Sequence, residues 1–284
     1  MIEVKNLFFK YNKSHEYAVD GISFDINEGE IFGFLGPNGA GKSTTQKILT
    51  GILPVQDGEI YLRKERIEKF NNDYFNAIGV SFEQPNIYGK LTGKENLDFF
   101  ASMYDYPVQS SSNLLKMVDL DNAANKKAGE YSKGMQQRLV FARSLINRPK
   151  ILFLDESVSG LDPSNAVLIK EIIKELRKQN TTIFLTTHNM TVADELCDRV
   201  AFINSGKIVL IDSPRNLKLR YGRKLVKIEY ENDGCLNKEI LSLVDDKDKQ
   251  RIVEITKTKL IETIHSQEAT LEDIFIKVTG RELG

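Results

Sequence analysis

The chain has 284 residues, of which 41% are hydrophobic and 28% are charged. This balance is typical of a soluble globular protein with a sizeable core, and the length allows either one large domain or one domain with a small appendage. The formal net charge is only -1. A protein that grips nucleic acid by neutralising phosphates usually has a basic excess, so the charge argues against nucleic-acid binding as the main function.

Cysteine content and hydropathy bear on the compartment. The two cysteines, Cys197 and Cys235, are too few for a disulfide framework and fit a reducing compartment. The sequence has no run of roughly 18 apolar residues, the length that a membrane span needs. Residues 1–9 alternate like a strand and carry Glu3 and Lys5, unlike a signal peptide. We therefore expect a chain that serves any membrane process through a partner.

From the first residue to about residue 212, strand-like and helix-like patterns alternate, which is typical of an α/β domain. The strands predicted in the first half are short and apolar, at residues 2–9, 22–26, 31–35, 58–62 and 78–82. A helix is predicted over 42–49. From Lys94 to Tyr131 apolar residues recur at helical spacing, so we predict a mostly helical subdomain inserted into the core.

The second half resumes the alternation. Its predicted elements are a helix at 132–146, a strand at 151–154, a helix at 163–177, a strand at 182–186 and a hairpin that joins 200–203 to 207–211. Pro149 ends the first of these helices, because proline cannot continue a helix.

The pattern changes after Pro214. Alternating strands are predicted at 225–231 and 251–256, with a solvated loop at 245–249 between them. Thr270 then caps a closing helix. These elements predict a small α+β appendage of about seventy residues.

A glycine-rich segment between the strand at 31–35 and the next helix matches G-x-x-x-x-G-K-[ST]; it consists of Gly36, Pro37, Asn38, Gly39, Ala40, Gly41, Lys42 and Ser43. Glycines permit backbone angles that side chains forbid, so consecutive N–H groups can point into one anion-sized hollow. The following helix adds its positive end. Lys42 supplies a charge for the β and γ phosphates, and Ser43 a hydroxyl for Mg²⁺. A chance match has a probability on the order of 1%, so we predict a phosphate-binding loop.

An acid pair, Asp155 and Glu156, follows the buried strand at 151–154. In open α/β sheets, ligands bind at the carboxyl ends of the strands. Asp155 is placed to hold Mg²⁺ or its water, and Glu156 to polarise the water that attacks the γ-phosphate. Alone, such a pair is more often a plain acidic turn. Beside a phosphate loop, it predicts a nucleotide hydrolase.

The segment 131–138, YSKGMQQR, indicates the class of hydrolase. It resembles the signature of the ATP-binding subunits of ABC transporters, commonly L-S-G-G-Q followed by Gln-Arg. Ser132, Gly134 and the Gln-Arg pair are kept, whereas Tyr131, Lys133 and Met135 replace the family's Leu, Gly and Gln. A serine at a helix start, followed by glycine, can offer its hydroxyl and N–H groups to an anion. The resemblance covers about residues 2–213.

The resemblance implies roles for further residues. Residues 159–162, SGLD, resemble the D-loop, which places Asp162 at the contact between two subunits. His188 resembles the switch histidine that reaches the γ-phosphate. Tyr11 resembles the aromatic residue that stacks on adenine, with Tyr17 as the alternative. The nucleotide-binding residues implied in this way are Tyr11, Gly36, Pro37, Asn38, Gly39, Ala40, Gly41, Lys42, Ser43, Thr44, Ser132, Gly134 and Asp162, with Glu156, His188 and Lys42 as the catalytic ones.

One position departs from the family pattern. The family usually has a glutamine two residues before a proline, at the end of the strand that leads into the helical subdomain. Counting back from Pro85 gives Glu83, with Gln84 one place late. Either side chain can ligate Mg²⁺ or its water, but a glutamate adds a negative charge. We expect Glu83 to occupy the position, with Gln84 as the alternative.

The resemblance therefore implies an α/β fold of the P-loop NTPase class, ABC type, with an antiparallel β-subdomain. We expect an ATP-binding cassette at 1–213, its helical subdomain at about 85–131, and the appendage at 214–284. The cofactors implied are ATP and Mg²⁺. The C-terminal segment 269–275, ATLEDIF, resembles the tail of many bacterial drug-exporter ATPases of the ABC-2 type, which favours export.

The same resemblance implies partners. Each ATP would lie between the phosphate loop of one subunit and the signature of another, so a second ATP-binding subunit is needed, in a homodimer or a hetero-pair. A separate multi-span permease would dock on the helical subdomain, at the cytoplasmic face of a bacterial cell membrane, and no nucleic acid is expected. The alternative is a soluble mechanical ATPase of the ABC type that acts on DNA or ribosomes. The short spacing between phosphate loop and signature, about ninety residues, and the single cassette disfavour it.

Overall fold

The computed structural model describes residues 1–12, 14–67, 70–222, 224–232 and 235–280. The chain divides into two compact units, the first from Met1 to Ser213 and the second beginning at Pro214. Each unit has its own sheet and its own hydrophobic core. Residues 281–284 of the predicted appendage lie outside the described residues.

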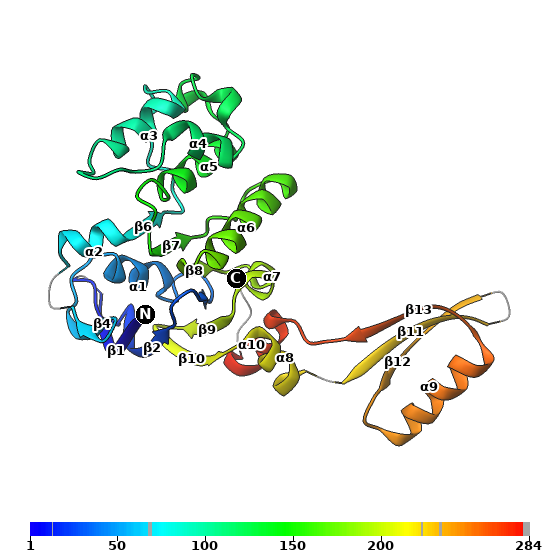
Figure 1. Cartoon of the computed structure of the whole chain (residues 1–284). Helices are drawn as coiled ribbons and strands as arrows, with labels where there is room; N and C mark the ends of the chain where they lie inside the picture. The colour runs from blue at the N-terminus through cyan, green and yellow to red at the C-terminus, as the bar shows by residue number, and fades with distance from the viewer. Residues whose placement is uncertain (13, 68–69, 223, 233–234, 281–284) are drawn as a thin grey trace. The chain divides into compact units, whose positions relative to one another are not determined.

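The first unit is built on a six-stranded sheet in the order β10-β9-β3-β8-β7-β6 (Figure 1). Neighbouring strands from β6 to β9 are parallel, and β10 is antiparallel to β9. A second sheet, in the order β2-β1-β4-β5, is antiparallel. The strands are β1 Ile2–Phe9, β2 Val19–Ile26, β3 Ile31–Leu35, β4 Asp57–Leu62, β5 Glu65–Arg66, β6 Ile78–Ser81, β7 Ile151–Asp155, β8 Thr182–Thr187, β9 Arg199–Asn204 and β10 Lys207–Asp212. The predicted α/β fold with an antiparallel β-subdomain is confirmed.

Helices follow most of the parallel strands and also form the inserted lobe. They are α1 Lys42–Leu49, α2 Asn72–Ala77, α3 Gly93–Ala101, α4 Ser111–Met117, α5 Lys133–Arg143, α6 Pro163–Lys178 and α7 Met190–Leu196, with short 3₁₀ turns at Asp121–Ala123 and Ala128–Glu130. In Figure 1, α3, α4 and α5 lie together in a lobe that projects from the sheet. The predicted helical character of Lys94 to Tyr131 is confirmed. None of the helices in the described residues combines the length and the apolar character of a membrane span.

A cluster of phenylalanines joins the two sheets of the first unit. Phe24 of β2 stacks on Phe32 of β3, with ring centroids 5.6 Å apart, and lies 6.2 Å from Phe184 of β8. Phe34 and Phe153 complete the cluster around Phe184. All five side chains are buried, so their close packing fixes the position of β3 and of its carboxyl end.

The second unit contains a three-stranded antiparallel sheet in the order β12-β11-β13. Its elements are α8 Pro214–Tyr221, β11 Leu225–Asn232, β12 Cys235–Ser242, α9 Asp246–Thr258, β13 Leu260–Gln267 and α10 Leu271–Thr279. The predicted alternation of β11 is confirmed, because Val226, Ile228 and Tyr230 are all buried in the core of this unit. Thr270 caps α10 as predicted, with Asp273 completing a capping box.

The strand predicted at 251–256 and the loop predicted at 245–249 are wrong. Residues 246–249 and 251–256 belong to helix α9, and Asp245 is its N-cap. The side chain of Asp245 accepts hydrogen bonds from the N–H groups of Lys247 and Asp248, which starts the helix. Ile255 is 1% exposed whereas Val253 is 49% exposed, so the two residues do not share a face as they would in a strand.

This difference in burial predicts different costs of truncation. Ile255→Ala should lower the free energy of unfolding of the second unit by about 2–5 kcal/mol, because it leaves a cavity between α9 and the sheet. Val253→Ala, the matched control, should change it by no more than about 0.5 kcal/mol. Urea unfolding of the full chain followed by circular dichroism measures both, and equal costs would contradict the helix.

Candidate active site

The glycine-rich loop leaves the sheet directly after β3 and is held tightly between backbone carbonyls. A Cβ atom on Gly36 would lie 2.2 Å from the carbonyl oxygen of Ile203, and one on Gly41 would lie 2.4 Å from that of Ala18. Gly41 also has a φ of 108°, in the region that favours glycine. The loop conformation therefore depends on glycine at these two positions.

Lys42, the first residue of α1, folds back over the loop. Its Nζ donates hydrogen bonds to the carbonyl oxygens of Gly36, at 2.7 Å, and Pro37, at 3.0 Å. Burial lowers the pKa of the Lys42 ammonium, against the opposing effect of the carboxylates of Glu156 and Asp155. A poorly solvated positive charge at the N-terminus of a helix is suited to bind an anion such as a phosphate.

The hydroxyl of Ser43 and the carboxylate of Asp155 converge beside Lys42. Ser43 Oγ lies 3.4 Å from Asp155 Oδ1, which also accepts a hydrogen bond from Thr186 Oγ1. Thr186 in turn contacts Gln46 of α1, with 3.3 Å between Thr186 Oγ1 and Gln46 Oε1. A hydroxyl and a carboxylate are hard oxygen donors of the kind that Mg²⁺ takes, so these residues fit the predicted metal.

Glu156 is only 6% exposed, and its own chain surrounds its carboxylate with donors. Oε1 accepts from the backbone N–H of His188 at 2.8 Å and lies 2.6 Å from His188 Nδ1. Oε2 accepts from Thr187 Oγ1 at 3.0 Å and from Ser159 Oγ. Burial alone raises the pKa of Glu156, but the hydrogen bonds from Ser159 and His188 outweigh it and lower the pKa. The carboxyl is therefore ionised at neutral pH, as a base must be.

Of the two candidate aromatic residues, Tyr11 contacts the helix that follows the phosphate loop. The Tyr11 hydroxyl is 3.2 Å from the hydroxyl of Thr44 in α1, and its half-exposed ring packs edge-on against Phe9. Tyr17 instead packs against Phe8, with ring centroids 5.6 Å apart. Tyr11 is therefore the better placed of the two to meet a base attached to phosphates in the loop.

The predicted Mg²⁺ ligand at the end of β6 differs between its two candidates. Glu83 and Gln84 are both exposed. The negative charge of Glu83 opposes the lowering of the Lys42 pKa by burial, but less than the charges of Glu156 and Asp155 do. The choice of Glu83 over Gln84 therefore stays a prediction.

The signature and D-loop residues form a second cluster. Ser132 caps α5 by accepting from the N–H of Met135 at 3.2 Å, and Asp162 caps α6. A Cβ on Gly134 would lie 3.6 Å from Leu161, so the two segments are in contact. Within the described part of the chain, no hydrogen bond connects this cluster to the phosphate loop. The two clusters are therefore separate groups of residues within one copy of the chain.

Three hydroxyl residues of the site, Ser159, Thr186 and Thr187, were not predicted. The two threonines end β8, where Thr186 pairs with Asp155 of β7 in parallel register. Polar residues at the end of an otherwise apolar strand, TIFLTT, are the signal that could have revealed them. Ser159 has no comparable signal, because its contact with Glu156 depends on the course of the loop.

Substitutions of Glu83 and Gln84 test which of the two residues is the metal ligand. Glu83→Ala should lower the ATPase rate by roughly tenfold or more, because it removes an oxygen donor beside Lys42 and the metal. Glu83→Gln should retain most of the rate, since the amide oxygen can still ligate. Gln84→Ala, the control, should stay within about twofold of the parent. Steady-state ATPase assays over a range of Mg²⁺ concentrations measure these effects, and a loss confined to Gln84→Ala would shift the assignment by one residue.

A glycine-rich phosphate loop after β3, an acid pair after β7 and a histidine after β8 define a P-loop nucleotide hydrolase of the ATP-binding cassette type. Comparison with known proteins agrees. Residues 19–159 match the ABC transporter family. The fluoroquinolones export ATP-binding protein of Mycobacterium tuberculosis is 50% identical over the whole of this chain and 94% of its own length. The Nod factor export ATP-binding protein I of Burkholderia thailandensis is 34% identical over 94% of this chain and 93% of its own length.

Solved structures agree as well. A dimeric ATP-binding cassette in a post-hydrolysis state, bound to ADP and Pi, has a TM-score of 0.68 and 28% identity over 75% of this chain and 98% of its own. An ATP-binding subunit of an ABC transporter has a TM-score of 0.70 and 25% identity over 78% of this chain and 93% of its own. The chain therefore belongs to the ABC transporter family, and with its relatives it is an ATP-hydrolysing subunit of the exporter type.

Proposed function

We propose that the chain hydrolyses ATP between two ATP-binding subunits arranged head to tail. The observation that carries the proposal is that each copy holds a phosphate loop and, in a separate cluster, the Ser132–Gly134 end of α5. The N-terminus of α5 offers N–H groups and a partial positive charge, which suit the γ-phosphate of an ATP held by the other copy. Binding of ATP then favours the closed pair, and hydrolysis removes the bridge.

In this arrangement each site residue has a distinct role. Lys42 holds the β and γ phosphates, and Tyr11 stacks on adenine. Ser43 and Asp155, with Glu83, hold Mg²⁺, which when bound neutralises phosphate charge. Glu156 orients the attacking water and accepts its proton. The remaining contacts to the nucleotide come from the loop residues Gly36, Pro37, Asn38, Gly39, Ala40, Gly41 and Thr44, from His188 at the γ-phosphate and from Ser132, Gly134 and Asp162 of the other copy.

The role of Glu156 predicts a trapped state. Glu156→Gln should bind ATP as tightly as the parent, lose turnover and accumulate as an ATP-bound dimer, because the amide cannot accept the proton. Size-exclusion chromatography with Mg-ATP detects the dimer. Lys42→Ala should give no dimer under the same conditions, since it weakens phosphate binding. A monomeric Glu156→Gln protein that still hydrolyses ATP would contradict the proposed function.

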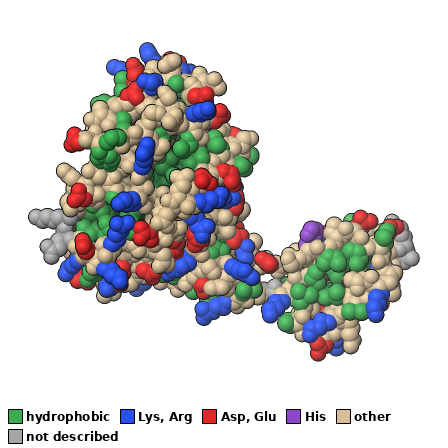
Figure 2. Space-filling view, in the orientation of Figure 1, with side chains coloured by type: hydrophobic (Ala, Val, Ile, Leu, Met, Phe, Trp, Pro, Cys, Tyr) green, Lys and Arg blue, Asp and Glu red, His purple; other side chains and the backbone are tan. Residues whose placement is uncertain are grey.

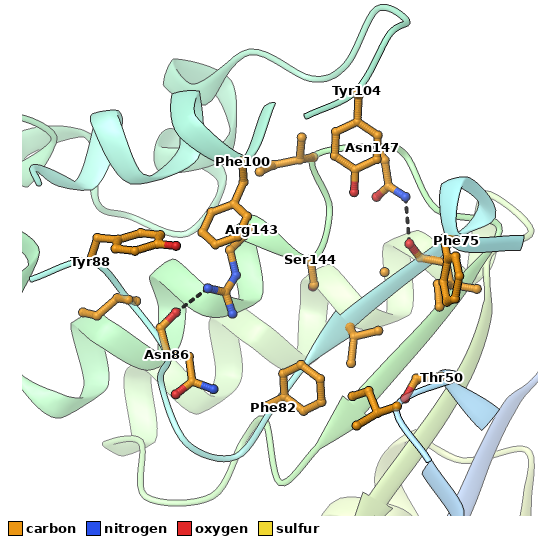
Figure 3. A pocket seen from close by; sticks show the side chains of 16 residues that line it. Thr50, Phe75, Phe82, Asn86, Tyr88, Phe100, Tyr104, Arg143, Ser144 and Asn147 are labelled. Atoms are coloured by element: carbon orange, nitrogen blue, oxygen red, sulfur yellow. Dashed lines mark hydrogen bonds between the residues drawn. The ribbon is translucent and has the colours of Figure 1, made fainter. Parts of the chain in front are cut away.

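We further propose that a separate membrane-spanning permease docks in a groove between the helical lobe and the sheet. The groove has a volume of about 640 Å³ and is lined by residues of α2, β6, α3 and α5 and of neighbouring loops, including Thr50 directly after α1. Figure 3 shows Tyr88, Phe100 and Arg143 lying together at one side of it. The Arg143 guanidinium lies over the Phe100 ring at 4.6 Å and donates to the carbonyl of Asn86.

The electrostatics of the groove indicate what should enter it. Burial lowers the pKa of Arg143, so its positive charge is poorly solvated. The sixteen described residues that line the groove include no aspartate or glutamate. An apolar segment that presents one carboxylate would cover the aromatic rings and complete the pairing of Arg143. We assign this segment to a cytoplasmic loop of the permease, which places the chain at the cytoplasmic face of a bacterial membrane.

Charge reversal tests the docking groove. Arg143→Glu should reduce recovery of a multi-span protein that co-purifies with the chain from solubilised membranes by tenfold or more, because it places two carboxylates together. Arg148→Glu, the same change at an exposed position outside the groove, should recover as much as the parent. Unchanged ATP binding shows that Arg143→Glu remains folded. Equal recovery by both variants would exclude the groove.

The surface charge disfavours the alternative of a mechanical ATPase on DNA or ribosomes. On the face of the first unit seen in Figure 2, basic and acidic side chains are interspersed rather than gathered by sign. A surface of this kind has no extended positive field for a phosphate backbone.

We assign the ATP-binding cassette to residues 1–213 and an accessory role in the transporter to the unit from Pro214.

A further inference from the structure

The carboxylate of Glu156 is saturated with hydrogen-bond donors from its own chain. Each of its two oxygens has two donors. Oε1 accepts from the backbone N–H of His188 and, with the ring proton on Nδ1 as an ionised Glu156 requires, from the His188 ring; Oε2 accepts from Thr187 and Ser159. A carboxylate offers about four lone-pair positions in total. The protein therefore occupies every acceptor position of the proposed base.

This saturation conflicts with catalysis. A general base must accept a hydrogen bond directly from the attacking water, at about 2.6–3.2 Å. While all four donors remain in place, Glu156 has no position left for that water. At least one donor has to leave before hydrolysis, so this arrangement of the carboxylate is a resting one.

Two of the donors are fixed by the sheet. Thr187 is the last residue of β8 and only 2% exposed, and its hydroxyl oxygen also accepts from the N–H of Asn189 at 3.0 Å. The backbone N–H of His188 belongs to the first residue after the end of β8. Neither can move without disrupting the carboxyl end of β8.

The other two donors are free to move. The His188 side chain is 47% exposed, so its ring can turn toward a γ-phosphate. Ser159 lies in the loop between β7 and α6, and is followed by Gly160, where a Cβ would meet nothing within 4 Å. The chain is thus loosely packed at Gly160. The backbone N–H of Ser159 donates to the carbonyl oxygen of Glu156 at 3.0 Å, so the hydroxyl is withdrawn by rotation of the Ser159 side chain or by displacement of the segment that begins there.

The Ser159 loop also leads to the contact expected with a second subunit. Asp162, three residues later, caps α6, and Leu161 touches Gly134 at the start of α5. A second copy that engages Asp162 therefore acts on a segment whose near end holds Glu156. Withdrawal of the Ser159 hydroxyl would free one acceptor position on Oε2.

We propose that Ser159 is a positioning residue: its hydroxyl holds Glu156 in the resting arrangement until a second copy of the chain displaces segment 159–162. The inference rests on the proposed role of Glu156 as the base. It makes release of the base depend on two events, arrival of a γ-phosphate at His188 and docking of the second copy. A single subunit that binds ATP is thereby prevented from wasting it.

The test is the ATPase activity of full-length Ser159→Ala as a function of protein concentration. A hydrogen bond present only in the resting form opposes assembly, so its removal should lower the protein concentration for half-maximal activity by on the order of tenfold. The apparent KM for ATP should fall rather than rise at low protein concentration, because ATP binding and assembly of the pair are linked. Ser159→Thr keeps the hydroxyl and should restore the parent behaviour.

Two further variants make the result specific. Ser164→Ala removes the same atom from an exposed position in the first turn of α6 and should behave as the parent. Ser159→Cys replaces the hydroxyl by a thiol, which is a weak donor, and should shift the concentration dependence in the same direction as Ser159→Ala. It replaces Ser159→Ala in the test if the alanine variant unfolds.

The outcomes separate this inference from the proposed function. An unchanged concentration dependence for Ser159→Ala, or a lower plateau rate that Ser159→Thr rescues, would overturn the resting role, because the hydroxyl would then be neutral or needed in the active form. Retained turnover in Glu156→Gln would instead overturn the base itself. Loss of turnover in Glu156→Gln together with the shift in Ser159→Ala supports both.

Discussion

The register of the parallel strands β3, β7 and β8 determines where the phosphate loop, the acid pair and His188 lie. Leu35 of β3 pairs with Thr187 of β8, and Asp155 of β7 pairs with Thr186 of the same strand. The three strands therefore end together, and the phosphate loop, the acid pair and His188 leave the sheet at one edge. A slip of one residue in β7 would turn Asp155 toward the opposite face and away from Ser43. The phenylalanine cluster beneath these strands opposes such a slip.

The chemistry at this edge is half of what a complete site needs. Lys42 and Ser43, which suit the phosphates, begin α1 directly after the loop, whereas the helix N-terminus suited to the γ-phosphate lies in the cluster of α5 and the D-loop. In the arrangement we propose, ATP interacts with both halves only when two subunits face each other, so its binding energy would favour the closed pair. The four donors around Glu156 would add a second requirement, because they keep water from the base until the partner arrives. ATP affinity and hydrolysis rate would then depend on the same assembly step.

Strong local patterns made much of this predictable from sequence. Glycine spacing identified the phosphate loop, and Asp155 and Glu156 follow an apolar strand whose end could be recognised. Helix α9 was missed because Val253 and Ile255 also fit a strand, and the decisive cap by Asp245 is a local hydrogen bond rather than a hydrophobic pattern. The donors to Glu156 were missed for another reason. Ser159 and Thr187 come from different segments, and only the folded chain brings them to one carboxylate.

Helix α5 connects two surfaces that the preceding sections treat separately. Ser132 caps one end, where the second subunit is expected, and Arg143 is its last residue, in the groove proposed for the permease. Eleven helical residues span about 16 Å, and an unbroken helix of this length is a stiff rod. A push on the guanidinium end would therefore tilt the serine end without any intervening hinge. In the arrangement we propose, closure of two subunits around ATP would reach the permease through α5 as one rigid element.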